Sequence, residues 1–382
     1  MKIEQKQWTP KENWKTLTAI PLPSEPQLVL AFGARPVLGD QVRFEEIKSM
    51  YPHSHIVTCS TSGEILGTEV SDGTISLTAI YFEKTGVQVS QTEITESSES
   101  FEAGKRLAAG LPKEGLAHTM IFSDGLKVNG TALVRGIAEV LGENIQITGG
   151  LAGDGSSFKE TLVGVDGIPT SGKIVLVGFY GTDLKVGYGS FGGWDPFGPE
   201  RLITRSKDNV LYELDNKPAL ELYKRYLGDR AKDLPASGLF FPLSMRITDK
   251  SGRTTEVIRT CLAINENEQS ITFAGDMPEG SSVRLMKVGF ESLIDGAEDA
   301  ARESIGVSTE TKPDLAILVS CVARKLVLSE RTEEELEAVR QILGGNALLA
   351  GFYSYGEISP TAEMRDCSQL HNETMTITTF RE

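Results

Sequence analysis

Glycine-rich polar loops follow apolar stretches at three places in this chain, and they hold the residues best suited to ligand binding. Each place has a short apolar stretch, an amphipathic stretch of helical length, a second apolar stretch and then the loop. Glycine lets a backbone approach a ligand closely, and hydroxyl and carboxyl groups add directed contacts, although the same glycines also suit tight turns. The candidate ligand-binding residues of these loops are Ser62, Glu64, Asp154, Tyr353, Tyr355 and Glu357. Three further candidates lie at strand ends of the second place: Ser123 and Asp124 follow its first apolar stretch, and Gly150 ends its second.

Two arginines lie beside apolar residues of predicted strands. The guanidinium groups of Arg259 and Arg324 are suited to holding a ligand carboxylate through two parallel hydrogen bonds. A structural ion pair with Glu64, Glu357 or another buried acid is the alternative, and it is slightly favoured. The two arginines are therefore candidate ligand-binding residues with an open structural role.

His371, Asn372 and Cys321 complete the candidate ligand-binding residues. A histidine can orient a ligand, transfer a proton or ligate haem iron, or it can simply bond backbone carbonyls in the core. Cys321 ends a predicted strand close to Arg324, and with His371 it would form a candidate thiol nucleophile. A small buried apolar residue is the commoner role for such a cysteine.

The elements that must position these residues repeat along the chain. The three copies begin with the apolar stretches 28–33, 119–122 and 315–320, continue through helices near 40–50, 131–141 and 333–343, and reach second apolar stretches at 56–60, 145–150 and 347–352. Ligands of open α/β sheets bind beyond the carboxyl ends of the strands, so a pocket is expected at these loops. Repetition of this kind indicates duplicated units.

The order of elements around the second copy also matches that around the third. Both have two strands, a helix (97–109 or 290–305), a strand, a helix and a strand, at offsets of 196 residues for Ile121 and Ile317 and 201 for Leu151 and Phe352. The predicted fold class is α/β with mixed sheets, in two related, duplicated halves that each have a mixed β-sheet flanked by helices. We predict an irregular N-terminal arm at 1–26 and two domains at 27–230 and 231–382. The third helix is expected to start with a capping box of Thr332 and Glu335.

Composition excludes several classes of function. The chain has 382 residues, a formal net charge of −15 and an isoelectric point of about 4.9, which argues against nucleic acid and anionic membrane surfaces as partners. The longest apolar run is of strand length, and the first residues have no apolar signal core, so we expect a cytoplasmic protein without membrane insertion. The cysteines form no CxxC pair, and the few histidines disfavour a multi-histidine metal site.

Several short motifs follow one another in a defined order. They are Gly149-Gly150-Leu151-Ala152-Gly153-Asp154, Gly193-Trp194-Asp195-Pro196-Phe197-Gly198, Val257-Ile258-Arg259, Cys321-Val322-Ala323-Arg324, Tyr353-Ser354-Tyr355-Gly356-Glu357-Ile358 and Leu370-His371-Asn372. In this order they resemble the N-terminal and C-terminal parts of the FIST family of sensory domains over nearly the whole chain. The resemblance implies an intracellular sensor of a small ligand, such as an amino acid, that passes its signal to a partner protein such as a kinase or cyclase.

Three alternatives remain beside this sensor. Some FIST members bind haem and sense nitric oxide, which would make haem the cofactor and His371 its ligand. An enzyme acting on a small carboxylated metabolite through Cys321 and His371 is a second alternative, although no convincing catalytic constellation is present. The third is a protein-interaction scaffold without a ligand, as the association of a related region with an F-box suggests.

Overall fold

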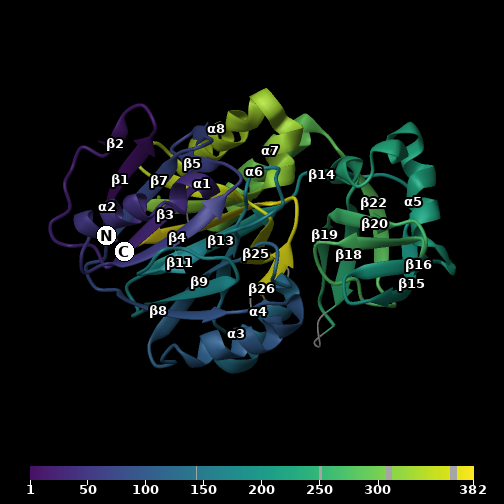
Figure 1. Cartoon of the computed structure of the whole chain (residues 1–382), viewed down its shortest axis with the longest axis horizontal. Helices are drawn as coiled ribbons and strands as arrows, with labels where there is room; N and C mark the ends of the chain where they lie inside the picture. The colour runs from purple at the N-terminus through teal and green to yellow at the C-terminus, as the bar shows by residue number, and fades with distance from the viewer. Residues whose placement is uncertain (143, 249–251, 307–311, 362–367) are drawn as a thin grey trace.

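The computed structural model describes residues 1–142, 144–248, 252–306, 312–361 and 368–382. Figure 1 shows two lobes, a main lobe that contains both termini and a small lobe on the right of the view. The small lobe consists of residues 194–288 and is inserted between β13 (Lys185–Phe191) and α6 (Phe290–Ile305) of the main lobe. The chain thus leaves the main lobe once and returns to it before the third sequence copy.

Each sequence copy forms a parallel strand pair at the centre of one sheet of the main lobe. The pairs are β3 (Leu28–Ala34) with β4 (His55–Thr61), β9 (Leu116–Ser123) with β10 (Ile147–Leu151), and β23 (Leu315–Cys321) with β24 (Leu348–Ser354). Antiparallel strands flank each pair, so all three sheets are mixed. The predicted fold class of mixed α/β sheets flanked by helices is confirmed.

Helices connect the strands of each pair, as the helical spacing predicts. The connections are α1 (Arg35–Leu38) and α2 (Gln41–Met50), α4 (Gly130–Leu141), and α7 (Val322–Leu328), η4 (Ser329–Arg331) and α8 (Thr332–Leu343). Asp40 caps α2 and Asn129 caps α4 by accepting hydrogen bonds from backbone N–H groups of their first turns. Before the second and third pairs lie η1 (Ser97–Glu99) with α3 (Ser100–Ala109), and α6, respectively.

The three sheets exchange strands in a closed cycle. After its parallel pair, each copy sends a short strand into the neighbouring sheet: β5 (Glu64–Leu66) pairs with β24, β25 (Gly356–Pro360) with β10, and β11 (Val163–Val165) with β4. The chain then returns to its own sheet through β7 (Ile75–Tyr81), β12 (Lys173–Tyr180) or β27 (Met375–Arg381). This exchange brings the loops that follow β4, β10 and β24 together at one place.

Outer strands complete the sheets. β1 (Lys2–Thr9), β8 (Gly86–Glu93) and β13 pair with the three returning strands, and β2 (Asn13–Thr16), β6 (Glu69–Ser71) and β26 (Ser368–His371) add one edge strand to each sheet. Residues 2–9 and 13–16 are therefore ordered strands, where the sequence analysis expected an irregular arm.

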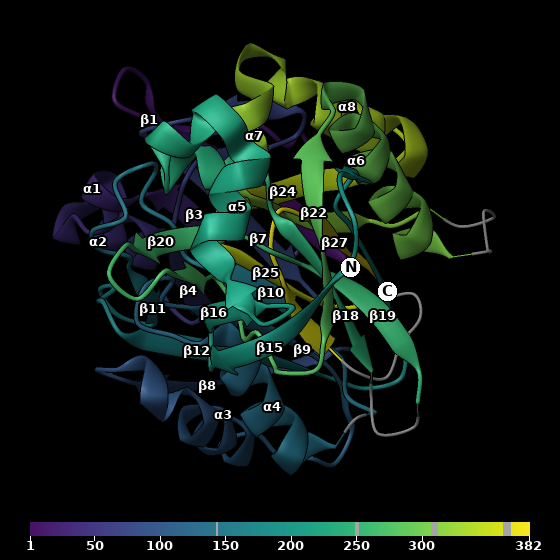
Figure 2. The ribbon, with the colours of Figure 1, turned by 90° about the vertical axis from the view of Figure 1, so that its right-hand side faces the viewer.

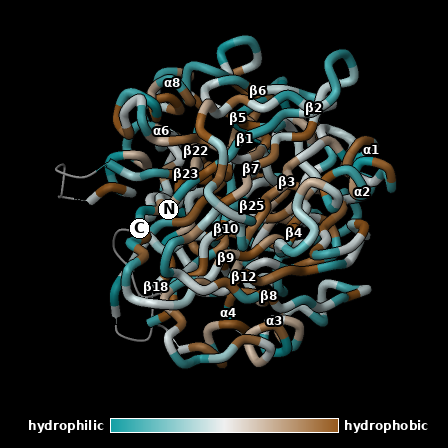
Figure 3. The backbone as a smooth tube through the Cα atoms, turned by 90° about the vertical axis from the view of Figure 1, so that its left-hand side faces the viewer, coloured by the Kyte–Doolittle hydropathy of each residue, from teal (hydrophilic) through white to brown (hydrophobic). Residues whose placement is uncertain are grey.

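The space between the three sheets is filled by an apolar core. Phe32, Phe122 and Phe352 come from different sheets, and their ring centroids lie 4.8 to 6.3 Å apart. Figure 3 shows the hydrophobic stretches along these central strands and more hydrophilic segments toward the periphery. Gly150 faces this core, where an added Cβ would lie 2.6 Å from Val319 Cγ1. The centre of the main lobe is thus a packed interior.

The small lobe is built mainly from antiparallel strands. Figure 2 shows it facing the viewer with α5 (Ala219–Leu227) in front. Its own apolar core contains buried residues of α5 and of the sheet, and the boundary predicted at residue 230 falls inside η2. The remaining elements are β14 (Trp194–Pro196), β15 (Arg201–Lys207), β16 (Val210–Leu214), β17 (Lys217–Pro218), η2 (Gly228–Asp233), η3 (Ala236–Phe240), β18 (Leu243–Thr248), β19 (Thr254–Arg259), β20 (Cys261–Asn265), β21 (Ser270–Phe273) and β22 (Ser282–Val288).

Candidate ligand site

The loops after β4, β10 and β24 meet and bond to one another, at a place that we call the strand-end junction (residues 61–64, 151–155 and 353–356). Ser62 N donates to Tyr353 O at 2.8 Å, and Tyr353 N donates to Gly63 O at 2.9 Å. Tyr355 N donates to Leu151 O at 3.1 Å, and Ser62 Oγ donates to Gly155 O at 3.0 Å. The structure therefore brings Ser62, Tyr353 and Tyr355 together, with their loops filling the space between them.

Glu64 and Glu357 hold equivalent positions in two of these loops. Thr61 Oγ1 donates to Glu64 at 2.5 Å, and Ser354 Oγ donates to Glu357 at 2.5 Å. Each carboxylate also accepts from the backbone N–H and hydroxyl of a threonine, Thr74 for Glu64 and Thr374 for Glu357. Burial raises the pKa of Glu64 to about 7 and that of Glu357 to about 8, and the hydrogen bonds only partly offset it.

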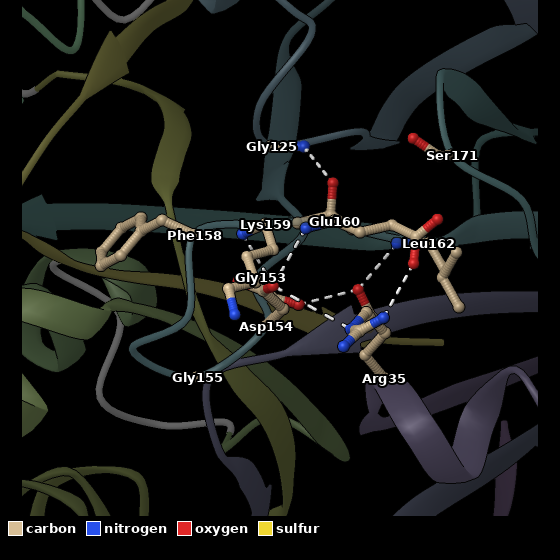
Figure 4. A network of polar contacts seen from close by, with 12 residues as sticks. Arg35, Gly125, Gly153, Asp154, Gly155, Phe158, Lys159, Glu160, Leu162 and Ser171 are labelled. Carbon is tan, nitrogen blue, oxygen red and sulfur yellow. Dashed lines mark hydrogen bonds and ion pairs between the residues drawn. The ribbon is translucent and has the colours of Figure 1, made fainter.

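Asp154 organises the loop after β10, as Figure 4 shows. Its Oδ2 accepts hydrogen bonds from Lys159 N and Glu160 N, both at 3.0 Å, and lies 4.0 Å from Arg35 Nε. Its Oδ1 accepts a hydrogen bond from the Tyr355 hydroxyl. Asp154 therefore stabilises a compact loop against the junction.

Ser123 and Asp124 form the turn after β9. The carboxylate of Asp124 accepts from Leu126 N and Lys127 N at 2.8 Å and from Gly172 N at 2.8 Å. Ser123 Oγ donates to the Asp124 carbonyl at 2.9 Å. Both residues are completely buried, so their polar atoms stabilise the turn itself.

A cleft of about 430 Å³ lies between the two lobes. The small lobe provides β18, β19 and β22, and the segment from β13 to β14 crosses between the lobes. The main lobe provides Thr361 after β25, His371 at the end of β26 and Thr374 just before β27. Its walls contain hydroxyl, aromatic and charged side chains, a mixture typical of small-molecule sites. The lining residues are Ser190, Phe191, Gly192, Gly193, Trp194, Arg246, Thr254, Thr255, Glu256, Ile258, Met286, Thr361, His371 and Thr374.

Buried polar groups beside this cleft join the lobes. Thr260 Oγ1 of the small lobe donates to Glu373 Oε1 at 2.7 Å, and Trp194 Nε1 donates to Glu373 O at 2.9 Å. Arg259 Nη1 donates to Leu370 O at 3.1 Å, and burial lowers the pKa of Arg259 to about 10. Arg259 thus bonds the backbone carbonyls of Ile258, Leu370 and Asp276, and the Asp276 carboxylate lies within electrostatic range of its guanidinium group.

Glu373 is a buried carboxyl group that the sequence analysis missed. Desolvation raises its pKa well above the ordinary value, and the nearby Glu357 adds to this effect. Among the described residues, Glu373 Oε2 and Asn372 Oδ1 accept no hydrogen bond. Its position directly after His371-Asn372 and within a run of strand-forming residues was the available signal.

Arg324 forms a buried ion pair with Glu335 of α8. Arg324 Nη2 lies 2.8 Å from Glu335 Oε2, and neither side chain is exposed to solvent. Arg324 therefore forms a structural ion pair with a buried acid, which the sequence analysis gave as the alternative to ligand binding. The predicted capping box is wrong, because Glu335 points to Arg324 and α8 has no side-chain cap.

Cys321 is buried beside Glu357 and Glu373, which lie within electrostatic range of its thiol. Burial first, and then these carboxyl groups, raise the pKa of the Cys321 thiol well above its ordinary value. A neutral buried thiol is a poor nucleophile, since the thiolate is the reactive form.

His371 lines the cleft and pairs with Glu357 across β25 and β26. Its Nε2 lies 3.0 Å from the Ser359 carbonyl oxygen, an arrangement in which the ring nitrogen donates its proton. In that tautomer the lone pair lies on Nδ1, so the bond to Ser359 does not by itself exclude a histidine that ligates a metal. The haem alternative stays a prediction.

The described residues contain neither a cluster of metal ligands nor a helix suited to crossing a membrane. No group of three or more His, Cys, Asp or Glu side chains in these ranges is arranged to hold a metal ion. Within the same residues, no helix combines the length and apolar character needed to cross a membrane.

The sequence of this chain matches a family of sensory domains. The family model described as FIST N domain matches residues 27–217, and that described as FIST C domain matches residues 219–360. The chain belongs to the FIST family. FIST domains are ligand-sensing signalling domains, and their tandem arrangement agrees with the predicted two related halves.

Individual proteins add little to this assignment. The chain is 22% identical over 315 residues to an uncharacterised protein of Methanocaldococcus jannaschii, covering 76% of this chain and 59% of that protein. It thus spans about 59% of that relative's length. Among solved structures, a cyanuric acid hydrolase from A. caulinodans shares 9% identity at a TM-score of 0.31, covering 94% of this chain and 91% of that one. No functional argument follows from so weak a likeness.

Proposed function

We propose that this protein is a sensor that binds a small molecule in the cleft between its lobes and passes the signal to a partner protein. The observation that supports this proposal is the 430 Å³ cleft with polar and aromatic walls drawn from both lobes. A ligand that contacts both lobes changes the free energy of their docking, and this effect is what a sensor requires. The membership of the FIST family supports the same function.

Charges on the cleft wall favour an amino-acid-like ligand. Arg246 and Glu256 face each other across β18 and β19, with Arg246 Nη2 3.8 Å from Glu256 Oε1 and 3.1 Å from Glu200 Oε1. All three side chains are partly exposed, and such ion pairs contribute only about 0–1 kcal/mol. A ligand carboxylate can therefore replace the glutamates on Arg246, while a ligand ammonium group takes Glu256.

The partner is proposed to be a signalling protein such as a kinase or cyclase. The alternatives have less support from the geometry. An enzyme would need the buried Cys321 thiol to react, and a haem sensor would need an apolar cavity beside His371, whereas charged and hydroxyl side chains line much of the cleft. A scaffold without a ligand would be favoured if no small molecule binds in the thermal-shift screen.

A thermal-shift screen of the whole chain tests the proposal. We expect amino acids to raise the unfolding midpoint in a saturable way, because a ligand of the native state stabilises it by about 2.7 kcal/mol at a hundredfold excess over Kd. Analogues that lack either the carboxylate or the ammonium group should give smaller shifts. The absence of any shift with amino acids, small carboxylates, amines and nucleotides would contradict the sensor and favour the scaffold.

A further inference from the structure

A buried carboxylate of the main lobe connects groups from four elements. Glu335 accepts hydrogen bonds from Arg324 Nε at 3.0 Å and Nη2 at 2.8 Å, from Tyr353 Oη at 2.6 Å and from Ser320 Oγ at 3.1 Å. Arg324, Glu335 and Tyr353 are not exposed to solvent. Buried charged groups must keep their partners, because an unpaired one is strongly destabilising.

The cluster of Arg324, Glu335 and Tyr353 also holds the segment that lines the cleft. Arg324 Nη1 donates to Gly192 O, and Nη2 donates to Leu293 O of α6 at 2.6 Å. Gly193 has a φ of +75°, and a Cβ there would lie 1.9 Å from Ser292 O. The cleft segment therefore packs on α6 with no spare room, and a displacement of Gly192 must disturb Arg324.

Toward the strand-end junction, the cluster acts through Tyr353. The backbone of Tyr353 exchanges hydrogen bonds with Ser62 and Gly63. Lys325, the residue after Arg324 in α7, donates from Nζ to Ser62 O at 3.0 Å. A change in the position of Tyr353 therefore reaches the loop after β4 directly.

We propose that the hydrogen-bond chain Gly192–Arg324–Glu335–Tyr353–Ser62 couples occupancy of the inter-lobe cleft to the conformation of the strand-end junction. When a ligand displaces the cleft segment, Arg324 loses the Gly192 carbonyl. The buried guanidinium must regain an acceptor, so Glu335 and Tyr353 shift with it. The inference rests on the proposed function, which supplies the ligand as the input.

The test fills the cleft with a covalent probe, so that no natural ligand is needed. Thr254 lines the cleft and is exposed, so Thr254→Cys in a Cys367→Ser parent accepts N-phenylmaleimide there. Cys59, Cys261 and Cys321 are buried. Hydrogen exchange of the whole chain is then compared with and without the label for peptides covering 62–66 and 153–160. Coupling of typical size changes exchange about fivefold or more.

Tyr353→Phe removes the hydroxyl that donates to Glu335 and keeps the ring. Tyr51→Phe is its matched control, because the buried Tyr51 also donates to a glutamate, Glu4, at 2.6 Å. We expect the label to change exchange at 62–66 in the parent and in Tyr51→Phe, and not in Tyr353→Phe. Equal transmission in Tyr353→Phe, or no change in the labelled parent, would overturn the inference.

The two proposals fail in different ways. If the label changes exchange at the junction while the ligand screen gives no shift, the coupling stands and the proposed function fails. If amino acids bind and the label leaves the junction unchanged, the coupling fails and the proposed function stands. Circular dichroism of each variant checks that it is folded before exchange is measured.

Discussion

The strand-end junction and the inter-lobe cleft are built from similar materials and differ in how their polar groups are used. Both combine glycines, hydroxyl groups and carboxyl groups. At the junction, the loops satisfy one another, and a Cβ on Gly153 would lie 2.3 Å from Ser62 Oγ. At the cleft, the walls stand apart around about 430 Å³ and carry Arg246 and Glu256. Glycine-rich loops therefore mark close chain packing in one place and a lining of open space in the other.

The largest effect should come from breaking the buried pair that connects these two regions. Arg324→Ala leaves Glu335 buried without its charged partner, so the free energy of unfolding should fall by about 3–5 kcal/mol. Urea denaturation measures this loss. Arg205→Ala is the control, because its pair with Glu213 is partly exposed and contributes at most about 1 kcal/mol. Similar losses in both variants would contradict the structural importance of the Arg324 pair.

A smaller effect is expected at Gly150, a candidate ligand-binding residue that the structure places in the packed core. Gly150→Ala puts a methyl group 2.6 Å from Val319 Cγ1 and 2.9 Å from Gly356 O, so overpacking should cost about 1–3 kcal/mol. Ligand affinity should stay unchanged in the folded fraction. A stable variant that has lost ligand binding would instead give Gly150 a role in the site.

For a single group and a single pH unit, the smallest effect should be the pH dependence of the free energy of unfolding. The pKa values of Glu64 and Glu357 are raised from 4.5 to about 7 and about 8 in the folded protein. The folded state therefore binds more protons than the unfolded state over this range, so each group lowers stability as pH rises, by at most about 1.4 kcal/mol per pH unit.

Two variants separate these groups. Glu64→Gln should flatten the dependence between pH 4.5 and about 7, and Glu357→Gln should flatten it up to about 8. Urea denaturation at several pH values measures both slopes. A wild-type protein that gains stability from pH 5 to 8 would contradict the assignment.

Much of the main lobe was predictable from the sequence, because the three copies repeat apolar strands and helices. Each of these elements is recognised from the spacing of apolar residues that are close together in the sequence. The strands that the copies exchange were not predictable, since β5 and β11 have three residues each and their partners are fixed by tertiary packing. The cleft combines Arg246 and Glu256 with His371, which no local pattern relates. Glu335 was assigned to a helix cap because the sequence does not show Arg324 beside it.

Calorimetric titration of an amino acid found by the screen tests the central claim most directly. Arg246→Gln removes the cleft cation proposed to hold the ligand carboxylate, and Arg205→Gln removes an ion-paired arginine of the same lobe that does not line the cleft. The account predicts that affinity falls at least about tenfold in Arg246→Gln, as expected when a charged hydrogen bond of about 1.5–3 kcal/mol is lost, and stays unchanged in Arg205→Gln. Equal affinity in both variants and the wild-type protein would contradict binding through Arg246 in the cleft.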